Sequence, residues 1–149
     1  MLYIGADHGG FGLKEKIKEF LTTAKIDFTD VGNYKLDMKD DYVDFVEKVV
    51  KGVKMDLKNN KGIVICRSGV GSAGTANKYD GIMAVNTNTA TMAQKAREDN
   101  DANILALGGD YVDPSTAWNI VKRFLNTSFA KKPRYIRRIK KIGQIEKKN

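Results

Sequence analysis

The sequence predicts an α/β fold: a doubly wound, mainly parallel sheet of five strands with helices on both faces, in a single domain over residues 1–149 that ends in a C-terminal helix. Short apolar segments alternate with amphipathic segments of helical period along the chain. Strands that alternate with helices pair in parallel, because each helix returns the chain to the same edge of the sheet. A chain of 149 residues is also long enough for one sizeable core.

The first half of the chain contains three predicted strands and two predicted helices. Leu2–Ala6 is an apolar strand, Asp27–Val31 is a weaker one, and Ile63–Cys66 is rich in β-branched residues. Helices are predicted over Gly10–Ala24 and Tyr42–Leu57, because apolar residues recur there on one face. Those faces carry Leu13, Ile17, Phe20 and Leu21 in the first helix, and Phe45, Val46, Val49, Val50 and Val53 in the second.

The second half continues the alternation. A helix is expected to begin directly after the glycine-containing loop that follows Cys66, and Pro114 suits the first turn of a later helix. Gly108-Gly109 ends the last strand. The remaining predicted elements are strands at Gly81–Val85 and Asn103–Leu107, and helices at Thr89–Asp99, Pro114–Leu125 and Arg134–Ile145.

The net charge of +8 belongs to the C-terminal tail. Residues 131–149 contain nine Lys and Arg and one Glu, whereas the first 130 residues contain 17 basic and 17 acidic residues. The tail could contact nucleic acid, form a solvated helix, or bring arginines to a phosphorylated ligand. It has no recognisable nucleic-acid-binding motif, so we expect no nucleic-acid partner.

Composition indicates a cytoplasmic protein. No apolar run approaches the roughly 20 residues that a membrane span requires, so no membrane association is expected. The N-terminus becomes polar at Asp7, unlike a signal peptide. One cysteine excludes an internal disulfide framework. One His and one Cys cannot form a zinc site within the chain, so neither a metal nor a cofactor is expected.

The most informative segment follows the strand that ends at Cys66. The loop Ser68–Gly71 contains two glycines and leads into a helix, and a turn of this kind directs backbone N–H groups at one point. A thiol beside an oxyanion site can move a proton at a carbon next to a carbonyl group. The alternative is that Cys66 is a buried, inert thiol.

Two further strand ends are candidates for the same site, because ligands of such sheets bind outside the carboxyl ends of the strands. Asp7 and His8, the only histidine, follow the first strand, and Gly108–Asp110 follows the last. The segment Gly5–Gly10 lacks the glycine spacing of a dinucleotide-binding loop. An ordinary turn capped by Asp7 is the alternative interpretation.

In combination, these segments resemble the type B ribose-5-phosphate isomerase family, which includes the two galactose-6-phosphate isomerase subunits. The resemblance runs in order from residue 2 to about residue 146. The matching residues are Gly5-Ala6-Asp7-His8-Gly9-Gly10-Phe11 with Leu13-Lys14, Asp41-Tyr42-Val43-Asp44, Ile65-Cys66 through Gly71, Ala76-Asn77-Lys78, Asn100-Asp101-Ala102-Asn103, Leu105-Ala106-Leu107-Gly108-Gly109, Arg134 and Arg138.

The resemblance implies a Rossmann-like domain that forms homodimers or tetramers, with metal-free active sites shared between subunits. Its reaction is aldose–ketose isomerisation of a sugar phosphate through a cis-enediolate. Cys66 would be the base and Ser68 would lie near the ring oxygen, while the backbone of residues 67–71 would hold the enediolate oxygens. The implied catalytic residues are Cys66, Ser68 and Asp99, and the implied substrate-binding residues are Asp7, His8, Arg67, Ser68, Gly69, Val70, Gly71, Asn100, Arg134 and Arg138.

Four positions depart from the family pattern. Asp99 replaces a ring-opening histidine, and an Asp could act as that acid only with a strongly raised pKa. Asp110 replaces an arginine, and Tyr135 replaces a histidine. Arg67 replaces a glycine, which would cost about 1 kcal/mol or more if that position required positive φ. We hypothesise that Arg67 supplies the charge lost at Asp110 or forms a salt bridge with it.

The resemblance favours the ribose 5-phosphate and ribulose 5-phosphate pair as substrates. One alternative is a hexose 6-phosphate such as galactose 6-phosphate, acted on by this chain alone or together with a different partner chain. The other is a relative that binds sugar phosphates without catalysis.

Overall fold

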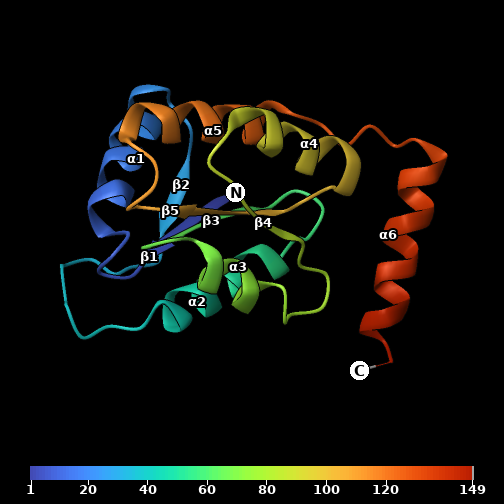
Figure 1. The fold of residues 1–149 in the computed structure, drawn as a ribbon, viewed down its shortest axis with the longest axis horizontal. Helices are drawn as coiled ribbons and strands as arrows, with labels where there is room; N and C mark the ends of the chain where they lie inside the picture. Colours follow the sequence, from blue (N-terminus) through green and yellow to red (C-terminus); the bar gives the residue numbers. More distant parts are fainter. Residues whose placement is uncertain (149) are drawn as a thin grey trace.

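The computed structural model describes residues 1–148 and contains one five-stranded sheet (Figure 1). All four pairings between neighbouring strands are parallel, in the order β2-β1-β3-β5-β4. The predicted doubly wound fold is therefore confirmed. The strands are β1 Leu2–Ala6, β2 Phe28–Asp30, β3 Lys61–Cys66, β4 Ala84–Asn86 and β5 Ile104–Gly108.

Helices cover both faces of this sheet. Helices α1, α4 and α5 lie on one face, and α2 and α3 lie on the other (Figure 1). Helix α6 stands at one end of the molecule, beside the sheet rather than on it. The helices are α1 Phe11–Thr23, α2 Tyr42–Lys54, α3 Val70–Ala76, α4 Ala90–Asn100, α5 Pro114–Asn126 and α6 Pro133–Glu146.

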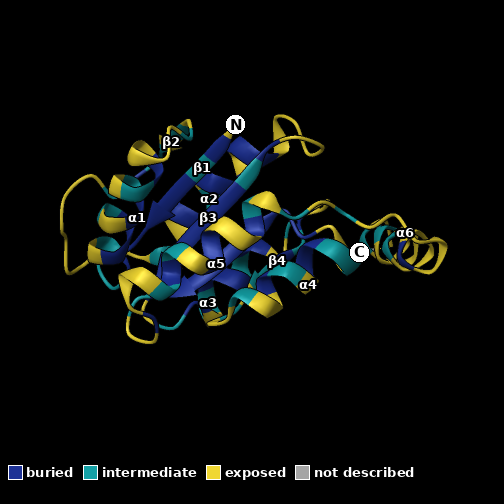
Figure 2. Cartoon of the chain, turned by 90° about the horizontal axis from the view of Figure 1, so that it is seen from above, coloured by how far each residue is buried: buried dark blue, intermediate teal, exposed yellow. Residues whose placement is uncertain are grey.

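Two apolar cores hold these layers together. The larger core packs α1, α4 and α5 against the sheet, with Ile17, Leu105 and Phe124 fully buried. The smaller core packs the valine face of α2 and the alanines of α3 against the other side. The buried residues follow the sheet and the inner faces of its helices (Figure 2). These cores fix the carboxyl ends of β1, β3 and β5 next to one another.

Two predicted boundaries are wrong for local reasons. Strand β4 begins at Ala84 rather than Gly81, because Gly81 takes a φ of 78° and the backbone N–H of Met83 donates to the side chain of Asn103. Helix α2 ends at Lys54 rather than Leu57, because a turn follows in which the Asp56 carboxylate accepts from the N–H of Asn59. Other boundaries differ by two residues or fewer.

Helix α6 contacts the body near both of its ends, and Tyr135 near its start is buried. The Glu146 carboxylate accepts from the N–H of Gly81 at 3.2 Å, and Ile139 and Ile142 line a cavity of about 370 Å³ that they share with Met83. Much of the apolar side of α6 is still exposed, including Ile145. Within residues 1–148, no helix is both long enough and apolar enough to cross a membrane.

Candidate active site

Cys66 lies at the carboxyl end of β3, and only 4% of it is exposed. Its Sγ accepts a hydrogen bond from the backbone N–H of Gly69 at 3.1 Å. The N–H of Val70, the first residue of α3, donates to Ser68 Oγ at 3.3 Å. A donor directed at sulfur stabilises negative charge there, so the predicted turn places a thiol where it can act as a base.

The close turn depends on two glycines. Gly69 takes a φ of 79°, and a Cβ at that position would lie 2.4 Å from Asn86 Oδ1. A Cβ on Gly108 would lie 2.7 Å from the carbonyl carbon of Ser68. The left-handed residue of the loop is thus Gly69, and Arg67 does not take a positive φ. The strain considered for Arg67 is therefore absent.

Asp7 is buried at the end of β1 and forms the turn into α1. Its Oδ1 accepts hydrogen bonds from the N–H groups of Gly9 at 2.9 Å and Gly10 at 3.1 Å. Burial raises the pKa of this carboxyl group above its ordinary value of 3.8, although the two N–H donors oppose the shift. Asp7 therefore has the turn-forming role that the sequence left open. Because β1 pairs with β3 up to Ala6 and Ile65, the turn also lies next to Cys66.

His8 is held by a residue that sequence analysis missed. Asp40 Oδ1 lies 2.7 Å from His8 Nδ1 and accepts from the His8 backbone N–H at 2.9 Å. The hydrogen bond with Asp40 is the largest of several influences that raise the pKa of the imidazole above 6.5. Asp40 lies 32 residues away in a polar segment with two other aspartates, Asp37 and Asp41, so no spacing singled it out.

Arg67 and Asp110 form the salt bridge that their charges suggested. Arg67 Nη1 lies 3.5 Å from Asp110 Oδ2, and both side chains are more than half exposed. An exposed pair at this distance contributes little to stability. The Arg67 side chain also packs against Gly9 in the turn after β1, because a Cβ on Gly9 would lie only 2.4 Å from Arg67 Cγ. Arg67 is close enough to His8 for its charge to oppose the raised pKa of the imidazole.

A cavity of about 300 Å³ lies beside Ser68. It is lined by Ser68, Val70, Asn86, Thr87, Asn88, Gly108, Tyr111 and Val112. The Asn86 side chain donates to the carbonyl of Ser68 at 3.2 Å and links the cavity to the loop. A larger hollow of about 750 Å³ between α4 and α5 includes none of the candidate residues, so we place no chemistry there.

The remaining candidates lie at the other end of the sheet. Asp99 and Asn100 end α4 and precede the amino end of β5, whereas Cys66 is paired with the carboxyl end of β5. About 13 Å of strand separates the two ends. Arg134, at the start of α6, donates to the Tyr135 hydroxyl at 3.0 Å and is close enough to Asp99 to feel its charge.

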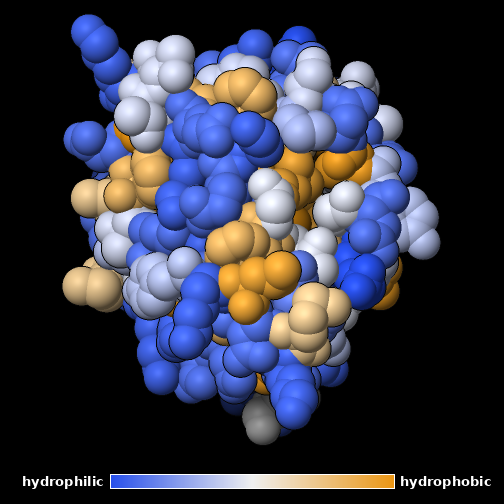
Figure 3. All heavy atoms as spheres, turned by 90° about the vertical axis from the view of Figure 1, so that its left-hand side faces the viewer, coloured by the Kyte–Doolittle hydropathy of each residue, from blue (hydrophilic) through white to orange (hydrophobic). Residues whose placement is uncertain are grey.

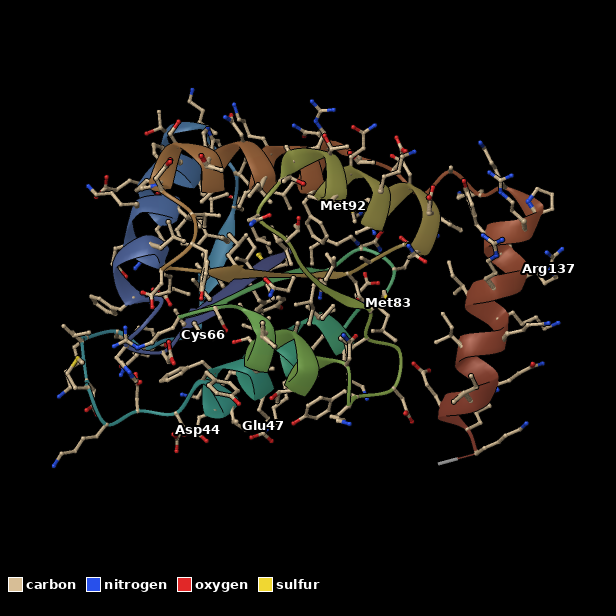
Figure 4. The ribbon with its side chains drawn as sticks, viewed as in Figure 1. Asp44, Glu47, Cys66, Met83, Met92 and Arg137 are labelled. Carbon is tan, nitrogen blue, oxygen red and sulfur yellow. The ribbon has the colours of Figure 1, made fainter. Side chains whose placement is uncertain are left out.

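The candidates therefore fall into two groups, and one chain does not bring the groups together. The first group surrounds Cys66 and contains Asp7, His8, Arg67 and the loop up to Gly71. Asp99, Asn100 and Arg134 form the second, with Arg138 one turn further along α6. Figure 4 shows Cys66 well away from α6, on which Arg137 is labelled.

Asp7, His8 and Asp40 also have atoms that could approach a cation, since one ligand atom from each lies within 4.8 Å of the others. Their observed contacts explain the cluster without an ion: Asp7 Oδ1 binds two N–H groups, and Asp40 Oδ1 binds the backbone and ring of His8. We assign no metal to this cluster.

The chain is similar to known proteins over almost its whole length. Residues 2–142 match the model of a family described as Ribose/Galactose Isomerase. A probable ribose-5-phosphate isomerase B of Mycoplasma genitalium is 38% identical over 146 residues, which cover 98% of this chain and 95% of that protein. A putative sugar phosphate isomerase of Bacillus subtilis is 37% identical, with 98% and 97% covered.

Solved structures extend the similarity to the whole fold. Ribose-5-phosphate isomerase B of Clostridium thermocellum superimposes with a TM-score of 0.93 at 42% identity, covering 99% of this chain and 97% of that one. The Mycoplasma genitalium enzyme, whose structure contains bound ribulose 5-phosphate, gives a TM-score of 0.94 at 37% identity with the same coverage.

Proposed function

Since this chain belongs to the ribose/galactose isomerase family, we propose that it is an aldose–ketose isomerase that interconverts ribose 5-phosphate and ribulose 5-phosphate. The observation that carries the proposal is the hydrogen bond from the Gly69 N–H to Cys66 Sγ, beside the Asp7 and His8 turn. The ribulose 5-phosphate bound to a relative of 37% identity supports this choice of substrate.

The chemistry requires one proton to move between adjacent carbons. The Cys66 thiolate removes the proton from C2 of the open-chain aldose. The electron pair of the broken C2–H bond forms the C1–C2 double bond, and O1 becomes negatively charged. The N–H groups of residues 67–71 stabilise this enediolate, because fixed donors need no reorganisation. Return of the proton to C1, with transfer of the O2 proton to O1, gives the ketose.

The sugar ring must open before this step. Opening requires an acid at the ring oxygen and a base at the C1 hydroxyl. Ser68, Asp99 and a bound water are the candidate groups, and Ser68 is the one beside the Cys66 loop in the same chain. Asp7, His8 and Asn100 would bind the sugar.

A second copy of the chain would complete the site. Its Asn100, Arg134 and Arg138 would approach the Cys66 group, which these residues cannot reach within one chain. Arginine suits the phosphate because its planar guanidinium binds two oxygens at once. We therefore propose a homodimer or a tetramer in the cytoplasm, built from one isomerase domain per chain, with the basic segment 131–149 contacting the partner subunit.

The first test measures isomerisation of ribose 5-phosphate by the purified chain and by Cys66→Ala. We expect kcat to fall by roughly 10³-fold or more in the variant, because a positioned base contributes 10²–10⁴-fold and the thiolate is also lost beside the oxyanion donors. Thermal melting followed by circular dichroism should show an unchanged fold.

Ser72→Ala is the matched control. Ser72 is buried in α3, one turn from the loop, and its Oγ has no partner among the described residues. Its loss should leave kcat within about twofold and preserve stability. Full activity of Cys66→Ala would reject Cys66 as the base, and a folded but inactive wild-type chain would reject this substrate pair.

A hexose 6-phosphate is the second candidate substrate. The cavity beside Ser68 offers about 300 Å³ and the side chains of Asn86, Thr87 and Asn88, which can bind additional hydroxyl groups. Comparing kcat/KM for ribose 5-phosphate and galactose 6-phosphate separates the two. A higher value for galactose 6-phosphate would reverse the assignment.

A further inference from the structure

We propose that Asp40 is a positioning residue, which holds the His8 imidazole in one orientation for binding the substrate and is itself tethered to α1 through Asn33 and Lys14. The ligand named here rests on the proposed function. The tether and the pairing with His8 rest on contacts within the chain.

The first step is the double contact between Asp40 and His8. One carboxylate oxygen, Oδ1, accepts from the His8 backbone N–H at 2.9 Å and lies 2.7 Å from Nδ1 of the ring. A carboxylate at Nδ1 keeps the proton on that nitrogen, and the second contact fixes the ring relative to its own backbone. The Asp40 side chain is only 7% exposed, whereas 21% of the His8 side chain is exposed. His8 is therefore held from the protein side and presents its other edge to solvent.

The second step is the tether that holds Asp40. Its other oxygen, Oδ2, accepts from Asn33 Nδ2 at 3.1 Å. The carbonyl of Asn33 accepts from Lys14 Nζ at 2.6 Å, and the same ammonium contacts both carboxylate oxygens of Asp30 at 2.8 and 2.9 Å. Lys14 is fully buried in α1. Moving the loop would take the Asn33 carbonyl away from a buried ammonium whose other close partner is Asp30.

The tether matters because residues 31–41 form no helix or strand. The tip of this loop exposes Tyr34, Leu36 and Met38, and apolar groups interrupt the hydrophilic surface on this side of the molecule (Figure 3). A loop with so little buried surface has low local stability. The contacts of Asn33 and Asp40 connect its two ends, and they give the residue that holds His8 a defined position.

The charges around His8 add an electrostatic effect. Asp40 from the loop and Asp7 from the end of β1 favour the imidazolium, while Arg67 after β3 and partial burial oppose it. The net result is a raised pKa of His8, with the Asp40 hydrogen bond as the largest cause. The pKa of Asp40 is lowered, since bonds from His8 and Asn33 outweigh its burial. A larger imidazolium fraction at neutral pH favours binding of a phosphate dianion.

The test uses the fact that His8 is the only histidine, so its NMR signals identify it directly. Asp40→Asn keeps oxygen and amide groups near their present positions but removes the charge. The His8 pKa should fall toward its ordinary value of 6.5 in this variant. Asn33→Ala should lower it by a smaller amount, because Asp40 then loses its tether.

Asp37→Asn is the matched control, since Asp37 is exposed on the same loop and accepts only from its own turn, at the N–H of Lys39. It should leave the His8 pKa unchanged. An unchanged His8 pKa in folded Asp40→Asn, or an equal shift in Asp37→Asn, would overturn the proposal. This measurement does not depend on isomerase activity, so it stands even if the proposed reaction is wrong.

Kinetics tests the link to the substrate. Asp40→Asn should raise the KM for ribose 5-phosphate about tenfold with kcat within about threefold, because the interaction holds the substrate rather than the reacting carbons. Asp40→Ala, which removes position as well as charge, should raise KM further. A fall in kcat at constant KM would contradict the assigned role.

Discussion

At the scale of single residues, two carboxylates near Cys66 have opposite electrostatic behaviour. Burial dominates at Asp7 and raises its pKa, whereas hydrogen bonds dominate at Asp40 and lower its pKa. The raised pKa of Asp7 means that its ionised form has a cost to stability. Such a cost is common where a residue is retained for binding rather than for folding.

Asp7→Asn should separate these two effects. A carboxyl group whose pKa is raised in the folded state loses stability as the pH rises through its ordinary value of 3.8 toward the folded value, and the full cost is present at pH 7. An amide oxygen can still accept from Gly9 and Gly10. We expect equal or higher free energy of unfolding at pH 7, and kcat/KM lower by roughly tenfold or more through loss of a charged hydrogen bond.

Urea denaturation at pH 7 and at pH 3, together with kinetics, tests this prediction. The difference in stability between the two proteins should shrink at pH 3, where the wild-type carboxyl group is protonated. A variant destabilised by more than about 1 kcal/mol at pH 7 would indicate that the turn needs the charge of Asp7.

Single residues also mark the limit of prediction from the sequence. The Cys66 turn was predictable, because an apolar strand, two glycines and a helix start are adjacent in the chain. The pairing of His8 with Asp40 was not, because it joins residues 32 apart through a loop without periodicity. The strain that a positive φ would cause at Arg67 is absent. The sequence could not show this, because backbone φ depends on how the loop packs against Asn86 and Gly108.

At the scale of elements, the β3–α3 connection determines whether the thiol meets its N–H donor. Strand and helix positions were predictable from hydrophobic period and composition. The start of β4 was not, because the N–H groups of Met83 and Ala84 donate to asparagine side chains instead of to a neighbouring strand. Such side-chain contacts to the backbone leave no periodic signal. The conformation of Gly69 places its own N–H toward Cys66 Sγ.

Gly69→Ala should damage both stability and activity. A φ of 79° costs a non-glycine residue roughly 1–2 kcal/mol, and the added methyl would meet Asn86 Oδ1. We expect a loss of about that size in the free energy of unfolding, with kcat reduced at least tenfold as the N–H moves from the sulfur.

Gly74→Ala supplies the control in α3, the helix that follows Gly69, because a Cβ there meets no atom within 4 Å. It should stabilise the protein by up to about 1 kcal/mol through helix propensity and keep its activity. Equal effects of the two substitutions would show that the Gly69 conformation is unimportant.

At the scale of the whole molecule, the sheet keeps two sets of candidate residues apart. The Cys66 group occupies the carboxyl ends of the strands, and Asp99, Asn100 and Arg134 occupy the amino ends. The sequence identified these residues but not this separation, because the topology of the sheet decides at which end each connection lies. The proposed site shared between two copies would unite them.

Mixing two inactive variants tests the shared site. Cys66→Ala and Arg134→Ala affect opposite groups, so a mixed dimer contains one intact site. Random reassociation after mild unfolding should recover about a quarter of wild-type activity, because half of the dimers are mixed and each has one working site of two. Cys66→Ala mixed with Asp7→Ala should recover nothing, since both changes affect the same group. Recovery in both mixtures, or in neither, would contradict the shared site.

In the proposed dimer, the separation across the sheet also makes turnover depend on mass action. A chain on its own presents the thiol without the arginines, however well it is folded. Turnover per chain should therefore decline on dilution in proportion to the fraction of chains that are paired. Substrate that contacts both copies should oppose their dissociation. The quantity of this protein that is made then sets the activity of each molecule as well as the number of molecules.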